Sequence, residues 1–297
     1  MKRRVKKKLI TLLILLILLF VSWYLENYNN KKNEINKRVN VPTNSNLTIY
    51  YLDVGQADSI LLSDNGHYML IDAGNEADGY KLVNFFKTLG IKSFDYVIGT
   101  HGHEDHIGGM DKIIDNFNIK HYYMPNVLVS SKNFEEVLDS LNRKRIKLET
   151  PNINQEFSLS NTKCKILYIG NDNEDINSNS IINRCVYYNT SFIFTGDATN
   201  ACEKKILDQD IKSDVLKLGH HGSQYSSSNE FLQKVQPKYG IISVGRDNIY
   251  GHPKKVTMNK MRYYNIEVYR TDLNGTIVVN SDGNNIKIST MESDVNG

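Results

Sequence analysis

The chain has 297 residues, of which 40% are hydrophobic and 23% charged, and its formal net charge is +3. Six basic residues lie within the first eight positions, so the rest of the chain is slightly acidic. This excludes a strong overall attraction for nucleic acid, although a local basic patch stays open. Cys164, Cys185 and Cys202 are widely spaced without a C-x-x-C pattern, and we expect three small core residues and no disulfide framework.

Behind the basic flank, residues 1–8, a nearly unbroken apolar run covers residues 9–25. Its length, about 17 residues, is near the lower limit for crossing a bilayer. Two interpretations are open: a cleaved signal peptide, which would release the protein, and an uncleaved transmembrane signal-anchor. No small-residue cleavage site follows, and Trp23 and Tyr24 suit a membrane interface, which favours the anchor. We therefore expect a single-pass protein of the cell membrane, with its basic flank in the cytoplasm and its catalytic domain extracytoplasmic.

Residues 26–46 are rich in Asn and Lys and predict a polar linker, residues 47–290 predict one domain, and residues 291–297 are a tail. Within the domain, alternating or continuous apolar runs predict strands, and helical spacing predicts helices. The expected strands are 47–55, 58–64, 67–74, 95–100, 120–125, 180–188, 191–197, 213–219, 239–245, 267–272 and 276–283. The expected helices are 78–89, 109–117, 133–142, 198–209, 229–235 and 253–264. This recurrence in two halves predicts an α/β protein with two sheets packed face to face and helices outside.

The most informative segment is residues 100–109, THGHEDHIGG, which follows a predicted strand and precedes a helix. It places His101, His103, Asp105 and His106 within six positions. His101 and His103 alternate, so they point the same way if the chain is extended there. Neutral imidazoles suit zinc, and carboxylates suit zinc or manganese. The segment therefore predicts a site for a pair of divalent ions, and the plain alternative is a histidine-rich surface loop.

Five further candidate residues lie at strand ends or in a loop beside one. Asp197 ends a strand and either bridges two ions or caps the next helix; the histidine cluster favours the bridge. His220 and His221 follow another strand, where adjacent residues face opposite ways, so we expect one of them to bind an ion. Asp72 is predicted to orient the histidines rather than bind the ion, and His252 to line the pocket.

Taken in order, the segments LDVGQADSILL, LIDAG, THGHEDHIGG, FTGDA, LKLGHHGS, ISVG, YGHP and YRTDLNGTI resemble the metallo-β-lactamase superfamily. More narrowly, residues 47–290 resemble the hydrolase domain of ComEC-type competence proteins. The resemblance implies a four-layer αββα sandwich with a metal site at one edge, between the sheets. It implies that His101 and His103 hold a first ion, that Asp105, His106 and either His220 or His221 hold a second, and that Asp197 bridges both.

Two departures from the family pattern concern the first ion. Many ComEC-type domains have H-x-D-x-D-H where this chain has His103, and better-known dinuclear members carry a further G-H-[ST] histidine. Here that interval contains only His121, in an ordinary strand, and Asn179 or Ser180 is the candidate replacement. We therefore expect the first ion to be weakly held, or the working site to contain one ion. With one apolar segment, the chain is not expected to form the channel that ComEC-type proteins carry.

The resemblance implies hydrolysis by a metal-bound hydroxide, with zinc favoured over manganese. Asp105 or Asp197 would orient or deprotonate the water, and His252, Ser223 or the unused member of the histidine pair would hydrogen-bond the phosphate or leaving group. The implied substrates are phosphodiesters: nucleic acid such as DNA, or choline esters of wall polymers; a β-lactam is disfavoured. A different class of function stays open, a non-catalytic or weakly active membrane-tethered binding protein of the DNA-uptake type. The sequence indicates no protein partner.

Overall fold

The computed structural model describes residues 16, 19–24, 47–172 and 175–291. The chain divides into two units, Met1–Asn40 and Val41–Gly297, and each is taken by itself. In the first unit, residues 19–24 are helical with exposed side chains. No helix among the described residues is long and apolar enough to cross a membrane. Most of the predicted span 9–25 lies outside the described residues, as do the predicted linker and nearly all of the predicted tail.

The second unit contains two mixed β-sheets. The first sheet has eight strands in the spatial order β15-β14-β1-β2-β3-β4-β5-β6. These strands are β1 (Leu47–Tyr51), β2 (Ile60–Asp64), β3 (His67–Ile71), β4 (Ser93–Ile98), β5 (Asn118–Tyr123), β6 (Leu148–Glu149), β14 (Thr276–Ser281) and β15 (Ile286–Met291). The second sheet has seven strands in the order β13-β12-β11-β10-β9-β8-β7. Its strands are β7 (Glu156–Leu159), β8 (Thr162–Tyr168), β9 (Ile182–Tyr187), β10 (Thr190–Phe194), β11 (Val215–Lys217), β12 (Tyr239–Ile242) and β13 (Glu267–Arg270).

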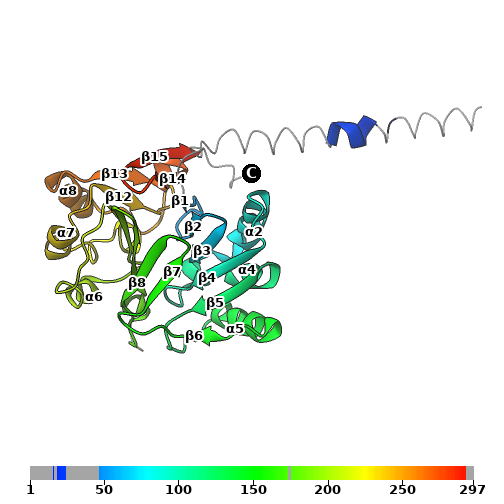
Figure 1. The fold of residues 1–297 in the computed structure, drawn as a ribbon, viewed down its shortest axis with the longest axis horizontal. Coiled ribbons are helices and arrows are strands. Elements are labelled where there is room, and N and C mark those ends of the chain that lie inside the picture. The colour runs from blue at the N-terminus through cyan, green and yellow to red at the C-terminus, as the bar shows by residue number, and fades with distance from the viewer. Residues whose placement is uncertain (1–15, 17–18, 25–46, 173–174, 292–297) are drawn as a thin grey trace, which may run out of the picture. The chain divides into compact units, whose positions relative to one another are not determined.

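Helices lie on the outer side of each sheet, α2, α4 and α5 beside the first and α6, α7 and α8 beside the second (Figure 1). The α-helices are α2 (Gly79–Thr88), α3 (Glu104–Ile107), α4 (Met110–Asn116), α5 (Lys132–Lys144), α6 (Asn200–Lys204), α7 (Asn229–Val235), α8 (Lys255–Tyr263) and α9 (Thr271–Asn274). Three short 3-10 helices are η1 (Glu76–Asp78), η2 (Ile176–Asn179) and η3 (His220–Gly222). The predicted two-sheet α/β sandwich is confirmed.

Apolar side chains fill the spaces between these layers. Between the sheets, Tyr51, Phe192 and Phe194 belong to one fully buried cluster, and Tyr51 stacks on Phe194. A separate cluster joins the second sheet to its helices through residues such as Phe231 and Met261. Both faces of the central strands are thus covered, which explains why the ends Phe192–Phe194 of β10 and Val215–Leu216 of β11 are apolar on both faces rather than alternating.

The predicted secondary structure differs from the observed one in one helix, and the last predicted strands divide between the two sheets. The helix expected over 198–209 is only Asn200–Lys204, followed by turns. The strands expected over 267–272 and 276–283 are both present but belong to different sheets, because β13 lies beside β12 in the second sheet while β14 lies beside β1 in the first. The chain crosses between sheets at α9, where Thr271 exchanges hydrogen bonds with the backbone of Val244.

The cysteines also depart from expectation. Cys164 on β8 and Cys185 on β9 face each other across the strand pair and form a disulfide, while Cys202 is free. All three are buried, as predicted, but the prediction of no disulfide was wrong. A separation of 21 residues carried no signal, because only the antiparallel register of β8 and β9 brings the two side chains together.

Candidate metal centre

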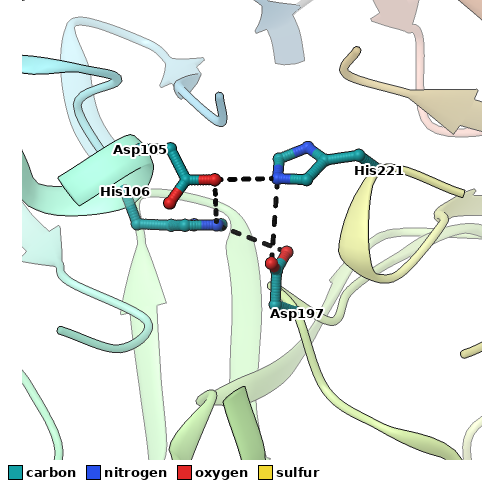
Figure 2. A group of neighbouring side chains, drawn as sticks. All are labelled: Asp105, His106, Asp197 and His221. Carbon is teal, nitrogen blue, oxygen red and sulfur yellow. Dashed lines mark hydrogen bonds and ion pairs between the residues drawn. The ribbon is translucent and has the colours of Figure 1, made fainter. Parts of the chain in front are cut away.

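Four side chains from three separate chain segments converge at one edge of the two sheets (Figure 2). Asp105 and His106 lie in α3 after β4, Asp197 follows β10, and His221 lies in η3 after β11. Each offers a ligand atom within 4.8 Å of the others. His106 Nε2 is 3.3 Å from Asp197 Oδ1, and His221 Nε2 is 3.2 Å from Asp105 Oδ2 and 3.7 Å from Asp197 Oδ2. We call these four residues the His–Asp cluster.

The His–Asp cluster has the donor chemistry of a divalent metal site. His106 Nε2 and Asp197 Oδ1 are buried and face each other at 3.3 Å, but they do not form a hydrogen bond. A buried polar atom without a hydrogen bond costs about 1–3 kcal/mol, and a cation bound at this point would satisfy both atoms. Two imidazoles and two carboxylates suit zinc, manganese and similar ions. The residues present therefore fit a divalent ion.

Charge within the cluster supports the same conclusion. Burial lowers the pKa of His106, but Asp197, Asp72 and Asp105 together raise it well above its ordinary value. Burial raises the pKa of Asp197, yet His106 and His221 hold it well below its ordinary value. Protonated imidazoles thus balance the carboxylates when no ion is bound. A divalent cation would supply the same positive charge and displace these protons.

Asp72 fixes the orientation of His106. This buried residue follows β3 with φ of +59°, a left-handed conformation that Asp adopts more readily than most residues. Its carboxylate accepts hydrogen bonds from Thr100 N (2.8 Å), Thr100 Oγ1 (2.7 Å) and His106 Nδ1 (2.7 Å). With a proton held on Nδ1, Nε2 is the His106 atom that faces Asp197 and would bind an ion once its own proton is displaced.

His220 and His221 lie in a turn, and the extended backbone expected for them was wrong. Both have positive φ, +50° and +52°, because His220 N donates to Gly196 O and Ser223 N returns to His220 O. His221 Nδ1 donates to Ser243 O at 2.9 Å, which directs Nε2 toward Asp105. His220 Nε2 lies 3.6 Å from Asp197 Oδ2 and its Nδ1 is buried without a partner. The structure thus places His221 in the His–Asp cluster and His220 beside it.

The His101–His103 side is built differently. His101 Nε2 and His103 Nδ1 lie 3.0 Å apart and share a hydrogen bond, so the two side chains converge as expected. Burial, followed by the neighbouring His106, lowers the pKa of His101 well below its ordinary value, so this imidazole is neutral. Ser180 Oγ accepts from Asp197 N at 3.1 Å and lies 3.4 Å from His101 Nδ1.

The structure distinguishes between Asn179 and Ser180, the two candidate replacements for the missing histidine. Asn179 uses its side-chain amide on the backbone of Asp172, accepting at 2.6 Å and donating at 2.7 Å. The Asn179 side chain therefore stabilises the loop that contains Asp172, whereas Ser180 lies next to His101 and Asp197. His121 lies on β5 and its Nδ1 is 2.9 Å from Glu149, as expected for an ordinary histidine.

His252 and Ser223 border the cluster. The His252 ring lies 5.6 Å from the ring of His220 and stacks on exposed Tyr250 at 5.9 Å. Burial, with His220 and His221, lowers the pKa of His252 to about 4, so this imidazole is neutral at neutral pH. Ser223 is buried, and its Oγ accepts from Tyr225 N at 3.3 Å, which places it within the turn.

Comparison with known proteins identifies the family. Residues 52–175 match the family model of the metallo-beta-lactamase superfamily. The chain carries a metallo-β-lactamase domain. The resemblance expected from the sequence is therefore confirmed, and the fold completes the domain by bringing Asp197 and His221, outside the matched residues, to the cluster.

The relatives of this metallo-β-lactamase domain are competence proteins of the ComEC type. The chain is 32% identical over 248 residues to ComE operon protein 3 of Bacillus subtilis, covering 76% of this chain and 32% of that protein. It is 28% identical over 231 residues to Competence protein ComA of Neisseria gonorrhoeae, covering 76% of this chain and 31% of that protein. The chain spans about a third of the length of these relatives.

A solved structure supports the fold. The metallo-β-lactamase fold protein YhfI of Bacillus subtilis superposes with a TM-score of 0.55 at 12% identity, covering 79% of this chain and all of that one.

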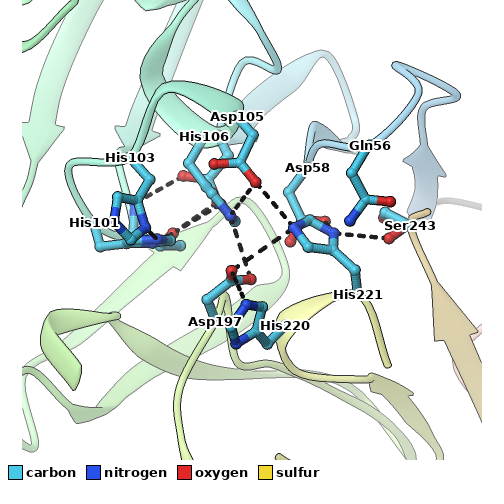
Figure 3. A network of polar contacts seen from close by, with 12 residues as sticks. Gln56, Asp58, His101, His103, Asp105, His106, Asp197, His220, His221 and Ser243 are labelled. Atoms are coloured by element: carbon cyan, nitrogen blue, oxygen red, sulfur yellow. Dashed lines mark hydrogen bonds and ion pairs between the residues drawn. The ribbon is translucent and has the colours of Figure 1, made fainter. Parts of the chain in front are cut away.

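Two residues of this metallo-β-lactamase domain escaped the sequence interpretation. Lys217 on β11 and Asp58 before β2 are buried and form an ion pair next to His221 (Asp58 and His221 are drawn in Figure 3). The signal was present in the run VLKL, where a lysine interrupts a strand that is otherwise apolar. A buried lysine requires a partner of opposite charge, and in the structure this partner is the carboxylate of Asp58.

Proposed function

We propose that this chain is a metal-dependent hydrolase of phosphodiesters in which Asp105, His106, Asp197 and His221 bind the ion. The observation that carries the proposal is the convergence of these four side chains, with His106 Nε2 and Asp197 Oδ1 buried and facing each other without a hydrogen bond. Zinc is the favoured ion because two ligands are imidazoles, and manganese is the alternative.

The chemistry divides between the ion and the chain. A bound divalent ion would polarise the phosphoryl group and make water more acidic. Asp105 is the only cluster member with a substantially exposed side chain, 30% against 0–3% for the others, so it faces the side from which water and substrate enter. Burial raises the pKa of Asp105, but His106 and His221 hold it below its ordinary value, so the carboxylate stays ionised. An ionised Asp105 accepts a hydrogen bond from an attacking water and orients it.

His252 is suited to the substrate rather than to the ion. Its ring lies beside His220 at the border of the cluster, and its Nδ1 has no hydrogen-bond partner. Because the imidazole is neutral at neutral pH, it offers one donor and one acceptor to a phosphate oxygen or a leaving group. Tyr250, stacked on it and exposed, leaves an aromatic face next to that position.

The substrate class follows from the relatives. One of them is named a competence protein and another, from Haemophilus influenzae, a recombination protein, which favours DNA among phosphodiesters. A choline ester of a wall polymer has the same phosphodiester chemistry and is the second candidate. Comparing turnover of linear DNA with turnover of a phosphocholine ester separates the two.

The proposed location is outside the cell membrane, with residues 9–25 as the anchor. The basic flank followed by an apolar run supports this orientation. The Cys164–Cys185 disulfide supports it independently, because disulfides persist in oxidising compartments. Digestion of intact cells with an added protease should remove the domain; protection from the protease would refute the orientation.

The test of the enzyme proposal uses the full chain in mild detergent. Metal content is measured together with turnover of bis-p-nitrophenyl phosphate. We expect bound metal and turnover in the wild type and loss of turnover by at least about 100-fold in Asp105→Ala and Asp197→Ala with folding retained. His121→Ala, which removes a histidine on β5 paired with Glu149, is the matched control and should retain turnover. Metal binding and DNA binding without turnover of any phosphodiester would establish the non-catalytic alternative instead.

A further inference from the structure

We propose that the buried ion pair of Lys217 and Asp58 is a positioning device that holds His221 in the orientation required to bind an ion. The inference rests on the proposed function, because it treats His221 as a metal ligand. It assigns a role to two residues that lie behind the His–Asp cluster rather than in it.

Lys217 is fully buried at the end of β11, inside the second sheet. Its Nζ lies 2.8 Å from Asp58 Oδ2 and donates to Leu218 O at 3.1 Å. Four residues later along the chain comes His221, after the turn at Gly219. The lysine therefore ties the strand that carries His221 to a carboxylate from the first sheet.

Asp58 contacts the cluster in two further ways. Its backbone N donates to Asp105 O at 3.0 Å, so the turn that carries Asp58 is joined to the segment that carries Asp105. Its free Oδ1 is buried, has no hydrogen-bond partner and lies 3.5 Å from His221 Nδ1. Asp58 thus contacts Lys217, Asp105 and His221 and holds these three residues together.

The face of His221 turned away from the cluster is fully occupied (Figure 3). Nδ1 donates to Ser243 O at 2.9 Å, with Asp58 Oδ1 as a second acceptor nearby. Two acceptors on this side keep a proton on Nδ1 and direct Nε2, the atom that would bind the ion, toward Asp105 and Asp197. Lys217 neutralises Asp58, so the carboxylate orients the ring without adding uncompensated charge behind it.

Stability alone does not require such a pair. Removing one member of a buried ion pair is strongly destabilising, but replacing both by apolar side chains of similar volume is often neutral or stabilising. A structural role and a positioning role therefore give different results in the double variant Asp58→Leu/Lys217→Met, which removes the charges together.

The experiment measures thermal stability and metal affinity of the full chain in four forms: wild type, the two single variants and the double variant. The probe is Co²⁺ alone, followed by its visible absorption, with Zn²⁺ affinity from competition. We expect each single variant to unfold roughly 10 °C lower and the double variant to recover most of this loss. We expect the double variant still to bind Zn²⁺ about 10–100-fold more weakly and to show an altered Co²⁺ spectrum.

Asp64→Asn is the matched control. Asp64 is a buried aspartate at the other end of β2, where it accepts from Asn161 N, Thr162 N and Thr162 Oγ1. It should lose stability and keep wild-type metal affinity. A double variant with wild-type affinity and spectrum overturns the inference, and so does one that stays as unstable as the singles, because the pair is then structural. A wild type without metal affinity refutes the proposed function first, and the inference with it.

Discussion

Replacing Asp72 by asparagine should weaken metal binding through the tautomer of His106. The carboxylate of Asp72 accepts three hydrogen bonds, from Thr100 N, Thr100 Oγ1 and His106 Nδ1. An asparagine that keeps the bond from Thr100 N turns its NH₂ group toward the other two partners. Thr100 Oγ1 can rotate its proton and accept, but His106 Nδ1 accepts only after losing its proton. The ring proton then moves to Nε2, the atom that faces Asp197.

The size of the effect follows from this geometry. Changing a group that orients a metal-binding histidine costs about 10–100-fold in metal affinity, which corresponds to about 1.4–2.8 kcal/mol. Folding loses one charged acceptor from a buried site, so the free energy of unfolding should fall by about 1.5–3 kcal/mol. The two losses are measured separately, the first by competition for Zn²⁺ against a chromophoric chelator and the second by urea unfolding of the metal-free protein.

Asp64→Asn provides the control, because Asp64 is equally buried and also accepts from two donors of one residue, Thr162 N and Oγ1, without touching a histidine. It should lose comparable stability and no metal affinity. Equal metal affinity in Asp72→Asn and Asp64→Asn would show that the tautomer of His106 does not control binding, and the reasoning would fail.

Three further predictions concern protons and the disulfide. Neighbouring carboxylates raise the pKa of His106 and of His221 against the effect of burial, so Zn²⁺ binding should release protons and become tighter as pH rises. Calorimetry in buffers of different ionisation enthalpy measures the protons released, and a result of no release would contradict this. Burial raises the pKa of Glu203 from 4.5 to about 7, so the folded protein keeps a proton that the unfolded chain loses. The contribution of Glu203 to stability is full below pH 4.5 and falls by about 3 kcal/mol as pH rises to about 7. In urea unfolding, Glu203→Gln should remove this fall of the unfolding free energy with pH. An unchanged pH dependence in the variant would contradict the prediction. Replacing Cys164 and Cys185 by serine opens a link between residues 21 apart and should cost about 3 kcal/mol of stability while leaving Zn²⁺ affinity unchanged.

The fold was predictable where the sequence carries continuous apolar strands and clear helical spacing. The assignment of strands to the two sheets was not predictable, because it depends on where the chain crosses from one sheet to the other. β13 and β14 are neighbours in the sequence, yet the α9 crossover sends them to different sheets. The same limit hid the disulfide, since Cys164 and Cys185 meet only in the register of β8 and β9.

The candidate site was predictable as a set of residue types and not as a geometry. Short-range spacing pointed to Asp105 and His106, and strand ends pointed to Asp197 and the His220–His221 pair. The choice between His220 and His221 required the left-handed turn, which is set by backbone hydrogen bonds from Gly196 and within the turn itself. The partners behind the cluster, such as Asp58, are far away in the sequence and were accessible only through the lysine that interrupts VLKL.

The two sides of the centre differ in charge, and this difference decides how ions would fill them. Asp105 and Asp197 give the His–Asp cluster two carboxylates, whereas His101 and His103 offer imidazoles that hydrogen-bond each other. An ion on the His101 side would have to break that bond, and the nearby negative charge of Asp197 would already be partly neutralised once the cluster is occupied. We therefore expect the cluster to fill first and the His101 side to fill more weakly. A phosphodiester placed between them adds the missing negative charge, so substrate binding would itself favour the second ion.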